Sequence, residues 1–156
     1  MKVFAALLLT IFLFTGFTNP PEKEYPPFKI EIAYKDLPNP MTTEYSIDNK
    51  KMTLNNVLYD NKEASYQSVN KSTYKNFDRE KLISFLKQTD WGSISSQFGT
   101  PTPDGYHYVV KIEINNQTYN FDIQNFYHPT FASLFKLCND AIPDKEKRAK
   151  YHLPYN

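Results

Sequence analysis

Apolar and polar side chains alternate in several segments of this chain. The clearest case near the start is residues 28–34, where almost every second side chain is a large apolar one. A period of two over such a run predicts a strand with one buried face. Weaker alternation in residues 42–47 and 51–59 predicts two further strands, joined by turn-forming residues 48–50. The more polar residues 65–74 predict an edge strand or a loop.

Residues 104–123 predict a β-hairpin. Two runs of alternating apolar residues flank Asn115 and Asn116, and asparagine tolerates the positive φ that a two-residue hairpin turn requires. A turn at Asn115–Asn116 opposes Ile112 with Tyr119, Val110 with Phe121, and Tyr108 with Ile123. A turn at Asn116–Gln117 also pairs apolar with apolar side chains, so the pattern limits the loop length but leaves two registers open.

Two segments change to the helical period. Residues 78–89 carry apolar residues at helical spacing, and Asp78 is placed to accept hydrogen bonds from the first free amides. A second helix is predicted from Pro129, which suits a first helical turn, to Ile142, after which Pro143 ends it. Its apolar positions, spaced as one face of a helix, are Phe131, Leu134, Phe135, Cys138 and Ile142.

These elements predict a single α+β domain over residues 28–143. The expected architecture is an antiparallel sheet of about five or six strands with two helices packed on one face. The expected order is β-β-β-(β)-α-β-β-α, in which residues 65–74 supply the strand in parentheses. Residues 144–156 are expected to form a charged C-terminal tail.

The chain begins with a pattern typical of an export signal. Lys2 precedes an uncharged apolar run, residues 3–14, and small residues follow it. A membrane-spanning helix needs about 20 apolar residues, more than this run provides. We therefore predict a signal peptide in residues 1–18, cleaved after Thr18, and a secreted or periplasmic protein. An uncleaved N-terminal membrane anchor is the alternative. The proline-rich residues 19–27 predict a linker.

Charge and cysteine content narrow the function classes. Removal of residues 1–18 takes away one lysine and no acid, so Lys+Arg falls from 18 to 17 against 17 Asp+Glu. A chain without a basic excess is not expected to bind nucleic acid. The one cysteine, Cys138, cannot form an intramolecular disulfide, and its place on an apolar helix face predicts a core position. The three histidines, His107, His128 and His152, show no metal-binding spacing, and we expect no metal or cofactor.

Aromatic residues in predicted loops and at strand ends form the candidate binding set. Such rings are over-represented at binding surfaces, although rings also plug the core beneath a loop. The candidate partner-binding residues are Trp91, Phe98, Tyr106, His107, Phe126 and Tyr127.

His107 also has a candidate catalytic neighbour. In the Asn115–Asn116 register it lies diagonal to Asp122, a separation that long side chains can bridge. A histidine–aspartate pair is one part of a general-base system. The sequence places no serine, threonine or cysteine nucleophile beside this pair, and the simpler interpretation is a polar pair on a solvent-facing sheet. We expect no catalytic residue here.

The second half of the chain resembles a known family. The segments DREKLISFL, PDGYHYVVKIEINNQTYNFDI and HPTFASLF, within residues 78–142, look like the C-terminal half of emfourin-like proteins. Those are small bacterial inhibitors of thermolysin-type metalloproteases, so the resemblance implies protease inhibition. The first strands match no motif of that family, and no inhibitory residue is carried over.

The sequence thus predicts an exported, non-catalytic binding module whose partner is a protein or a cell-envelope component. One alternative is a secreted protease inhibitor that acts through the loop of residues 92–105. A second alternative is a small hydrolase that uses His107 with Asp122. No stable membrane insertion is expected after signal cleavage, and the oligomeric state is left open.

Overall fold

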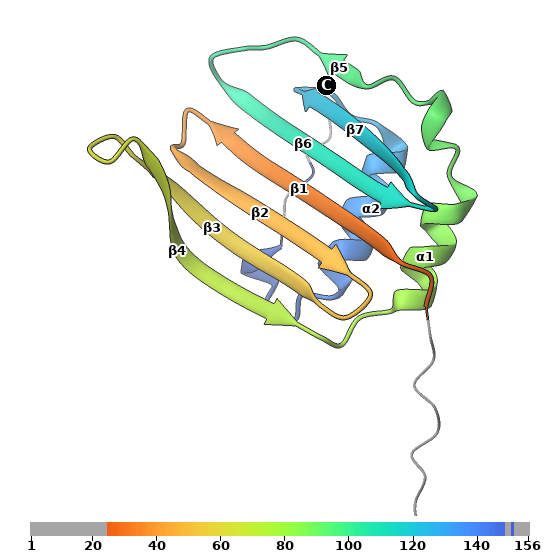
Figure 1. Ribbon diagram of the computed structural model, residues 1–156. Helices are drawn as coiled ribbons and strands as arrows, with labels where there is room; N and C mark the ends of the chain where they lie inside the picture. The colour runs from red at the N-terminus through yellow and green to blue at the C-terminus, as the bar shows by residue number, and fades with distance from the viewer. Residues whose placement is uncertain (1–24, 149–150, 152–156) are drawn as a thin grey trace, which may run out of the picture.

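The computed structural model describes residues 25–148 and residue 151. The predicted signal peptide, residues 1–18, and most of the predicted linker lie outside the described residues. Figure 1 shows one sheet with two α-helices. The elements in chain order are β1 (Phe28–Leu37), β2 (Met41–Asp48), β3 (Met52–Asp60), β4 (Ser65–Tyr74), α1 (Arg79–Gln88), the 3-10 helix η1 (Trp91–Ser93), β5 (Gln97–Gly99), β6 (Gly105–Ile114), β7 (Gln117–Gln124), α2 (Pro129–Asp140) and the 3-10 helix η2 (Lys145–Lys147).

The described strands form a seven-stranded sheet in the order β4-β3-β2-β1-β6-β7-β5. The α+β class is confirmed. The prediction of five or six strands in an antiparallel sheet is wrong in two respects, because there are seven strands and β5 runs parallel to β7. With only three residues, β5 is too short for a period of two to be visible in the sequence. The polar residues 65–74 form a full strand at the edge of the sheet.

The β6–β7 hairpin has the Asn115–Asn116 turn. These residues have φ of 52° and 61°, as a two-residue turn between twisted strands requires. The strands oppose Ile112 with Tyr119, Val110 with Phe121, and Tyr108 with Ile123. Of the two registers that the sequence leaves open, the chain therefore adopts the one with the earlier turn.

Both helices begin at the predicted residues. The side chain of Asp78 accepts a hydrogen bond from the amide of Lys81 at 2.9 Å, which confirms it as the N-cap of α1. Pro129 occupies the first turn of α2. The Nδ1 atom of His128 accepts a hydrogen bond from the amide of Thr130 at 3.3 Å. His128 is therefore the N-cap of α2, a role for which the sequence pattern gives no sign.

One face of the sheet carries the hydrophobic core. Buried apolar side chains of β1, β2, β3, β6 and β7 point to this face, and α2 lies behind the middle of the sheet in Figure 1. Ring contacts join the two layers. Phe131 of α2 lies 4.9 Å from Phe121 of β7, and Phe135 lies 5.0 Å from Tyr108 of β6, measured between ring centroids.

The opposite face, turned to the viewer in Figure 1, carries mostly charged and polar side chains. The ammonium group of Lys111 lies 2.6 Å from a carboxylate oxygen of Glu113 and 3.7 Å from one of Glu31. The hydrogen bond between Lys111 and Glu113 raises the pKa of Lys111 and lowers the pKa of Glu113. Charged pairs of this kind keep a sheet face in contact with water.

The described end of the chain folds back onto α2. The ring of Tyr151 stacks on Phe135 with centroids 4.9 Å apart, and its hydroxyl accepts a hydrogen bond from the amide of His128 at 3.1 Å. The remainder of the predicted tail, beyond residues 144–148 and Tyr151, lies outside the described residues. Within the described part of the chain, neither helix has the length and apolar character that crossing a membrane requires.

Candidate functional site

Trp91 lies in the core, so of the two roles that the sequence leaves open for the aromatic set it has that of a ring beneath a loop. Its side chain is 3% exposed, and its indole N–H donates a hydrogen bond to the carbonyl of Leu86 at 2.8 Å. The ring lies 5.9 Å from Phe121 and 6.2 Å from Phe131. Because η1 turns the chain back immediately after α1, Trp91 fixes the end of that helix to the sheet and to α2.

Two other predicted residues come together near the surface. The rings of Phe98 and Phe126 stack with centroids 5.3 Å apart, and Phe98 also lies 5.0 Å from the ring of His128. Phe98 belongs to β5, which pairs with the end of β7, and Phe126 follows β7 directly. Phe126 is 45% exposed and Phe98 is half-buried. The pairing of β5 with β7 therefore places an accessible aromatic pair at one end of the sheet.

The aromatic pair lies beside an exposed loop, Thr100–Asp104, of sequence Thr-Pro-Thr-Pro-Asp. Glycines with positive φ flank this loop, Gly99 at 78° and Gly105 at 107°. A Cβ atom on Gly99 would overlap the carbonyl oxygen of Gln124, and one on Gly105 would overlap the side chain of Asn125. Both ends of the loop thus pass so close to the last residue of β7 and the residue after it that only glycine fits.

Asn125 holds the loop in place. It has a φ of 51°, and its Oδ1 accepts a hydrogen bond from the amide of Tyr106 at 2.7 Å. Its own amide donates to the carbonyl of Tyr106 at 2.9 Å. Its Nδ2 donates to the hydroxyl of Thr102, which in turn donates to the carbonyl of Asp104. One side chain therefore ties the middle of the loop to its end.

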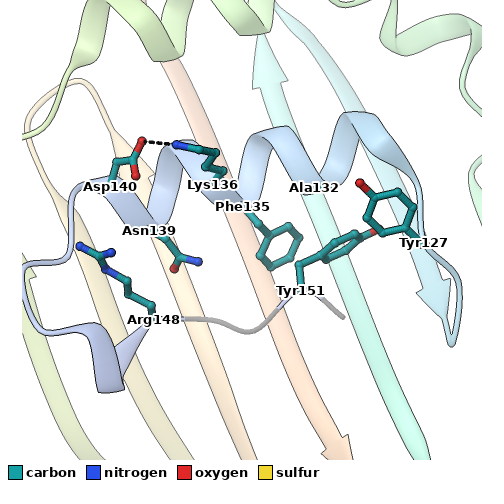
Figure 2. Close-up of a pocket in the computed structure, with 8 residues that line it drawn as sticks. All are labelled: Tyr127, Ala132, Phe135, Lys136, Asn139, Asp140, Arg148 and Tyr151. Atoms are coloured by element: carbon teal, nitrogen blue, oxygen red, sulfur yellow. Dashed lines mark hydrogen bonds and ion pairs between the residues drawn. The ribbon is translucent and has the colours of Figure 1, made fainter. Parts of the chain in front are cut away.

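Tyr127 lines a groove on the other side of the same segment. The groove has a volume of about 540 Å³ and runs along α2, as Figure 2 shows. One end is aromatic, with Tyr127, Phe135 and Tyr151 side by side. The other end is polar, with Lys136, Asn139, Asp140 and Arg148.

The hydroxyl of Tyr151 connects this groove to the loop end of the sheet. It accepts a hydrogen bond from the amide of His128 and donates one to the carbonyl of Phe126 at 3.4 Å. The hydroxyl is protonated at neutral pH and can make both contacts, and burial raises the pKa of Tyr151 further, to about 12. The segment of residues 125–128 is thus held from the loop side by Asn125 and from the groove side by Tyr151.

His107 and Asp122 form the predicted diagonal pair on the charged face of the sheet. Nε2 of His107 lies 3.1 Å from Oδ1 of Asp122, and Nε2 of Gln124 donates to the same oxygen at 2.9 Å. The side chains of His107 and Asp122 are 26% and 40% exposed. Among the described residues, no serine, threonine or cysteine side chain is hydrogen-bonded to the His107 ring. The hydrolase alternative gains no support from this arrangement.

Tyr106 lies on the core face of β6. Its ring stacks with that of Tyr34, with centroids 6.5 Å apart, and it is half-buried. Of the six candidate residues, Trp91 is thus internal, Tyr106 packs partly against the core, and His107 lies on the charged face. Phe98, Phe126 and Tyr127 lie along or beside the segment of residues 125–128.

Cys138 has the predicted core position. Its side chain is 2% exposed, and burial raises the pKa of its thiol to about 12. The thiolate, which is the nucleophile and the metal ligand, is therefore disfavoured at neutral pH. Among residues 25–148 and 151, no cluster of three or more histidine, cysteine, aspartate or glutamate side chains is arranged to hold a metal ion.

The residues that shape the loop are absent from the predicted set. Gly99, Gly105 and Asn125 carry no chemistry of their own, and Asn125 contacts a segment about twenty residues earlier in the chain. One signal was available, because the whole chain has four glycines and two of them flank Thr100–Asp104. Glycine at both ends of a short segment indicates a special backbone conformation.

Comparisons with protein-family models, with curated proteins and with solved structures find no match. The fold and the site define an α+β domain that presents a shaped loop and an aromatic pair at one end of its sheet. A proposal for its function therefore depends on this geometry and on the sequence.

Proposed function

We propose that this chain is an exported, non-catalytic binding module that contacts a protein or a cell-envelope component. The contact elements are the Thr100–Asp104 loop and the Phe98–Phe126 pair. One observation carries the proposal: the loop is exposed, and yet its two ends pass close to Gln124 and Asn125 and the side chain of Asn125 is hydrogen-bonded to it.

A loop with a fixed shape binds more tightly than a flexible one. Ordering a flexible backbone on binding costs about 1–2 kcal/mol per residue, and a loop that is already ordered avoids most of this cost. Pro101 and Pro103 restrict φ at two further positions. The exposed ring of Phe126 supplies an apolar contact beside the loop, and aromatic residues are enriched at binding interfaces.

The exposed Thr100–Asp104 loop and the exposed ring of Phe126 make this end of the sheet accessible to a partner. We propose that α1 and α2 pack on the same face of the sheet. Their shared contacts with Trp91 support this, because its ring lies 5.9 Å from Phe85 of α1 and 6.2 Å from Phe131 of α2.

Export to the periplasm or the medium is supported by the apolar run in residues 3–14.

Differential capture tests this function. Residues 19–156 are immobilised and exposed to the envelope fraction and the culture medium of the producing cell, and bound material is identified by mass spectrometry. A variant with Pro101→Ser, Pro103→Ser and Phe126→Ser is expected to lose the specific partner. Lys87→Ser, on the exposed side of α1, is the control and is expected to keep it. Equal capture by all three proteins contradicts binding through the loop.

Protease inhibition is the second candidate function, and the same loop favours it. Within residues 92–105, Thr100–Asp104 is the longest exposed stretch that belongs to no helix or strand, so it is the part best placed to meet a protease. A rigid exposed loop suits a protease cleft because it enters in one conformation.

Inhibition is measured with a thermolysin-type metalloprotease and a small fluorogenic peptide, at increasing concentrations of the wild-type chain and of the triple loop variant. Dose-dependent inhibition by the wild type and its loss in the variant support this candidate. Cleavage of the loop without inhibition of the protease contradicts the inhibitor function. Binding to other partners is tested separately by the capture experiment.

A further inference from the structure

A second concave site lies away from the loop, on the core face of the sheet. The strands β1, β2 and β3 extend past the part that α2 covers (Figure 1), and residues 146–148 line a hollow together with these strands. Between these elements is a pocket of about 260 Å³, which we call the β1–β3 pocket. Its lining includes Tyr34, Asp36, Asn39, Thr43, Asn56 and Arg148.

Tyr34 provides an aromatic wall of this pocket. On one side its ring stacks with Tyr108 of β6, with centroids 5.0 Å apart and planes 21° apart. Its cross-strand neighbour on the other side is Thr43 of β2, which is too short to cover the second face of the ring. One face of the ring is therefore supported by the core and the other is turned toward the pocket, which Tyr34 and Thr43 both line.

Polar groups with spare hydrogen-bonding capacity surround this ring. The Oδ1 atom of Asn56 accepts from the hydroxyl of Thr43 at 3.0 Å, and Oδ1 of Asn39 accepts from the amide of Met41 at 2.9 Å. Within the described part of the chain, the Nδ2 donors of both asparagines and the carboxylate of Asp36 have no hydrogen-bond partner. Arg148 uses its Nε to donate to the carbonyl of Ile142 at 2.8 Å, which orients its remaining donors.

The charges that line the pocket cancel. Asp36 and Glu146 are acidic, whereas Lys147 and Arg148 are basic. Lys147 also lies 3.8 Å from Asp144, outside the lining. The pocket thus combines an aromatic face with interspersed donors and acceptors and has no net formal charge.

From this arrangement we propose that the β1–β3 pocket binds a neutral saccharide ring. A sugar ring has an apolar face of C–H groups, which packs on an aromatic ring, and hydroxyls around its edge. Each hydroxyl both donates and accepts a hydrogen bond, so one hydroxyl can satisfy an Asn donor and another the Asp36 carboxylate. The pocket is near the lower limit for ligand sites, about 300 Å³, which fits one ring of a chain whose neighbours extend into solvent.

The test uses the chain of residues 19–156 labelled with ¹⁵N. It is titrated separately with glucose, galactose and N-acetylglucosamine at millimolar concentrations, and amide and asparagine side-chain signals are followed by NMR. At least one sugar is expected to shift the signals of Tyr34, Asn39 and Asn56 and to leave those of Thr100–Asp104 in place. Asp36→Asn is expected to weaken that binding about tenfold, because a charge-assisted hydrogen bond is lost.

Two further variants make the result specific. Tyr34→Leu keeps an apolar side chain on β1 and is expected to abolish the shifts, and a dispersed NMR spectrum shows that this variant is folded. Asp140→Asn, an identical chemical change in the groove of Figure 2, is the control and is expected to leave binding unchanged.

Three results would overturn the proposal. The first is the absence of shifts at the pocket with all three sugars, and the second is shifts that Asp36→Asn and Tyr34→Leu leave unchanged. The third is a clear preference for glucuronate or glucosamine over the neutral sugars, because a charged ligand contradicts the balance of charges. The loop variants of the capture experiment do not touch this pocket, so the two proposals succeed or fail separately.

Discussion

Asn125 and Tyr106 form a closed pair of hydrogen bonds across the end of the β6–β7 hairpin. The Oδ1 atom of Asn125 accepts from the amide of Tyr106 at 2.7 Å, and the amide of Asn125 donates to the carbonyl of Tyr106 at 2.9 Å. Because the same side chain also reaches Thr102, the loop and the hairpin are held by one residue.

Substitution of Asn125 is expected to free the loop. Asn125→Ala removes the side-chain hydrogen bonds to Tyr106 and Thr102 and places alanine at a φ of 51°, so we expect a loss of about 2 kcal/mol in the free energy of unfolding. Asn125→Asp keeps an acceptor for the amide of Tyr106, and we expect it to lower the free energy of unfolding about half as much as Asn125→Ala. Urea denaturation measures both, and limited proteolysis at Thr100–Asp104 shows the loop directly. Equal stability and equal proteolysis of the wild type and Asn125→Ala would contradict this role.

The glycines that flank the loop are expected to resist substitution. Gly105→Ala places a Cβ atom into the side chain of Asn125 and an alanine at a φ of 107°. We expect it to lower the free energy of unfolding by about 2 kcal/mol or more. Gly92→Ala is the matched control, since the nearest atom to its added Cβ is 3.6 Å away and its φ is not in the left-handed region. Thermal denaturation that ranks the two variants equally would show that the close approach is not a constraint.

The cap of α2 gives a second stability test. His128→Ala removes the acceptor for the amide of Thr130 and the ring contacts with Phe98 and Phe131. His128→Asn removes the same ring contacts but supplies a good N-cap acceptor. We therefore expect the asparagine variant to be about 1 kcal/mol more stable than the alanine variant. If chemical denaturation finds the two alike, the hydrogen bond to Thr130 contributes nothing measurable.

Trp91 allows an optical test of the core. Its buried ring is expected to emit at short wavelength and to be protected from acrylamide quenching in the native protein. Trp91→Ala is expected to lower the free energy of unfolding by about 3–5 kcal/mol, as for other large core rings. An emission spectrum typical of a solvated indole in the native state would contradict the burial of this residue.

High pH is expected to destabilise the fold. Burial is the largest cause that raises the pKa of Tyr34, Tyr151 and the Cys138 thiol to about 12, from ordinary values of 10.0 for tyrosine and 9.0 for cysteine. Because the pKa of each group is higher in the folded state than in the unfolded state, the folded state favours the neutral group. The contribution of these groups to the free energy of unfolding is therefore fully present below pH 9, the ordinary pKa of cysteine, and is lost as the pH rises towards 12. Denaturation midpoints measured from pH 7 upward should therefore fall through this window.

The reactivity of the Cys138 thiol tests its burial independently of the loss of stability at high pH. Cys138 should react slowly with a thiol reagent in the native state at pH 8 and rapidly in urea, since the reactive form is the thiolate. Fast native-state labelling would place the thiol at the surface and contradict its burial.

Much of the fold follows from the alternation of side chains. The apolar pattern limits the hairpin to two registers, and the tolerance of Asn115 and Asn116 for positive φ favours the one that opposes Tyr108 with Ile123; both are local properties. The N-cap role of Asp78 is local in the same way. The strand β5 is not predictable from such a pattern, because it has three residues and forms only when the end of β7 is beside it.

The candidate site was harder to predict because its geometry depends on contacts distant in sequence. Phe98 and Phe126 were recognisable as candidate rings, but their stacking depends on β5. The position of Trp91 in the sequence does not reveal that its N–H finds a partner at Leu86 and so permits burial. The β1–β3 pocket draws on four separate segments of the chain, and no spacing within any one of them indicates it.

The central place of β1 has a consequence for how the chain is made. β1 is the first of the described strands along the chain, yet one of its two partners is β6, with Phe28 opposite Ile114. A chain that lacks β6 has no partner strand for this edge of β1, and it also lacks the side chains of β6, β7 and α2 that bury the apolar face of β1–β3. An exposed strand edge of this kind invites pairing with other chains, and long-range pairing of strands is slow. A chain that stops before residue 105 is therefore expected to need a chaperone, whereas a chain that includes β6 can pair the exposed edge of β1 within the same molecule.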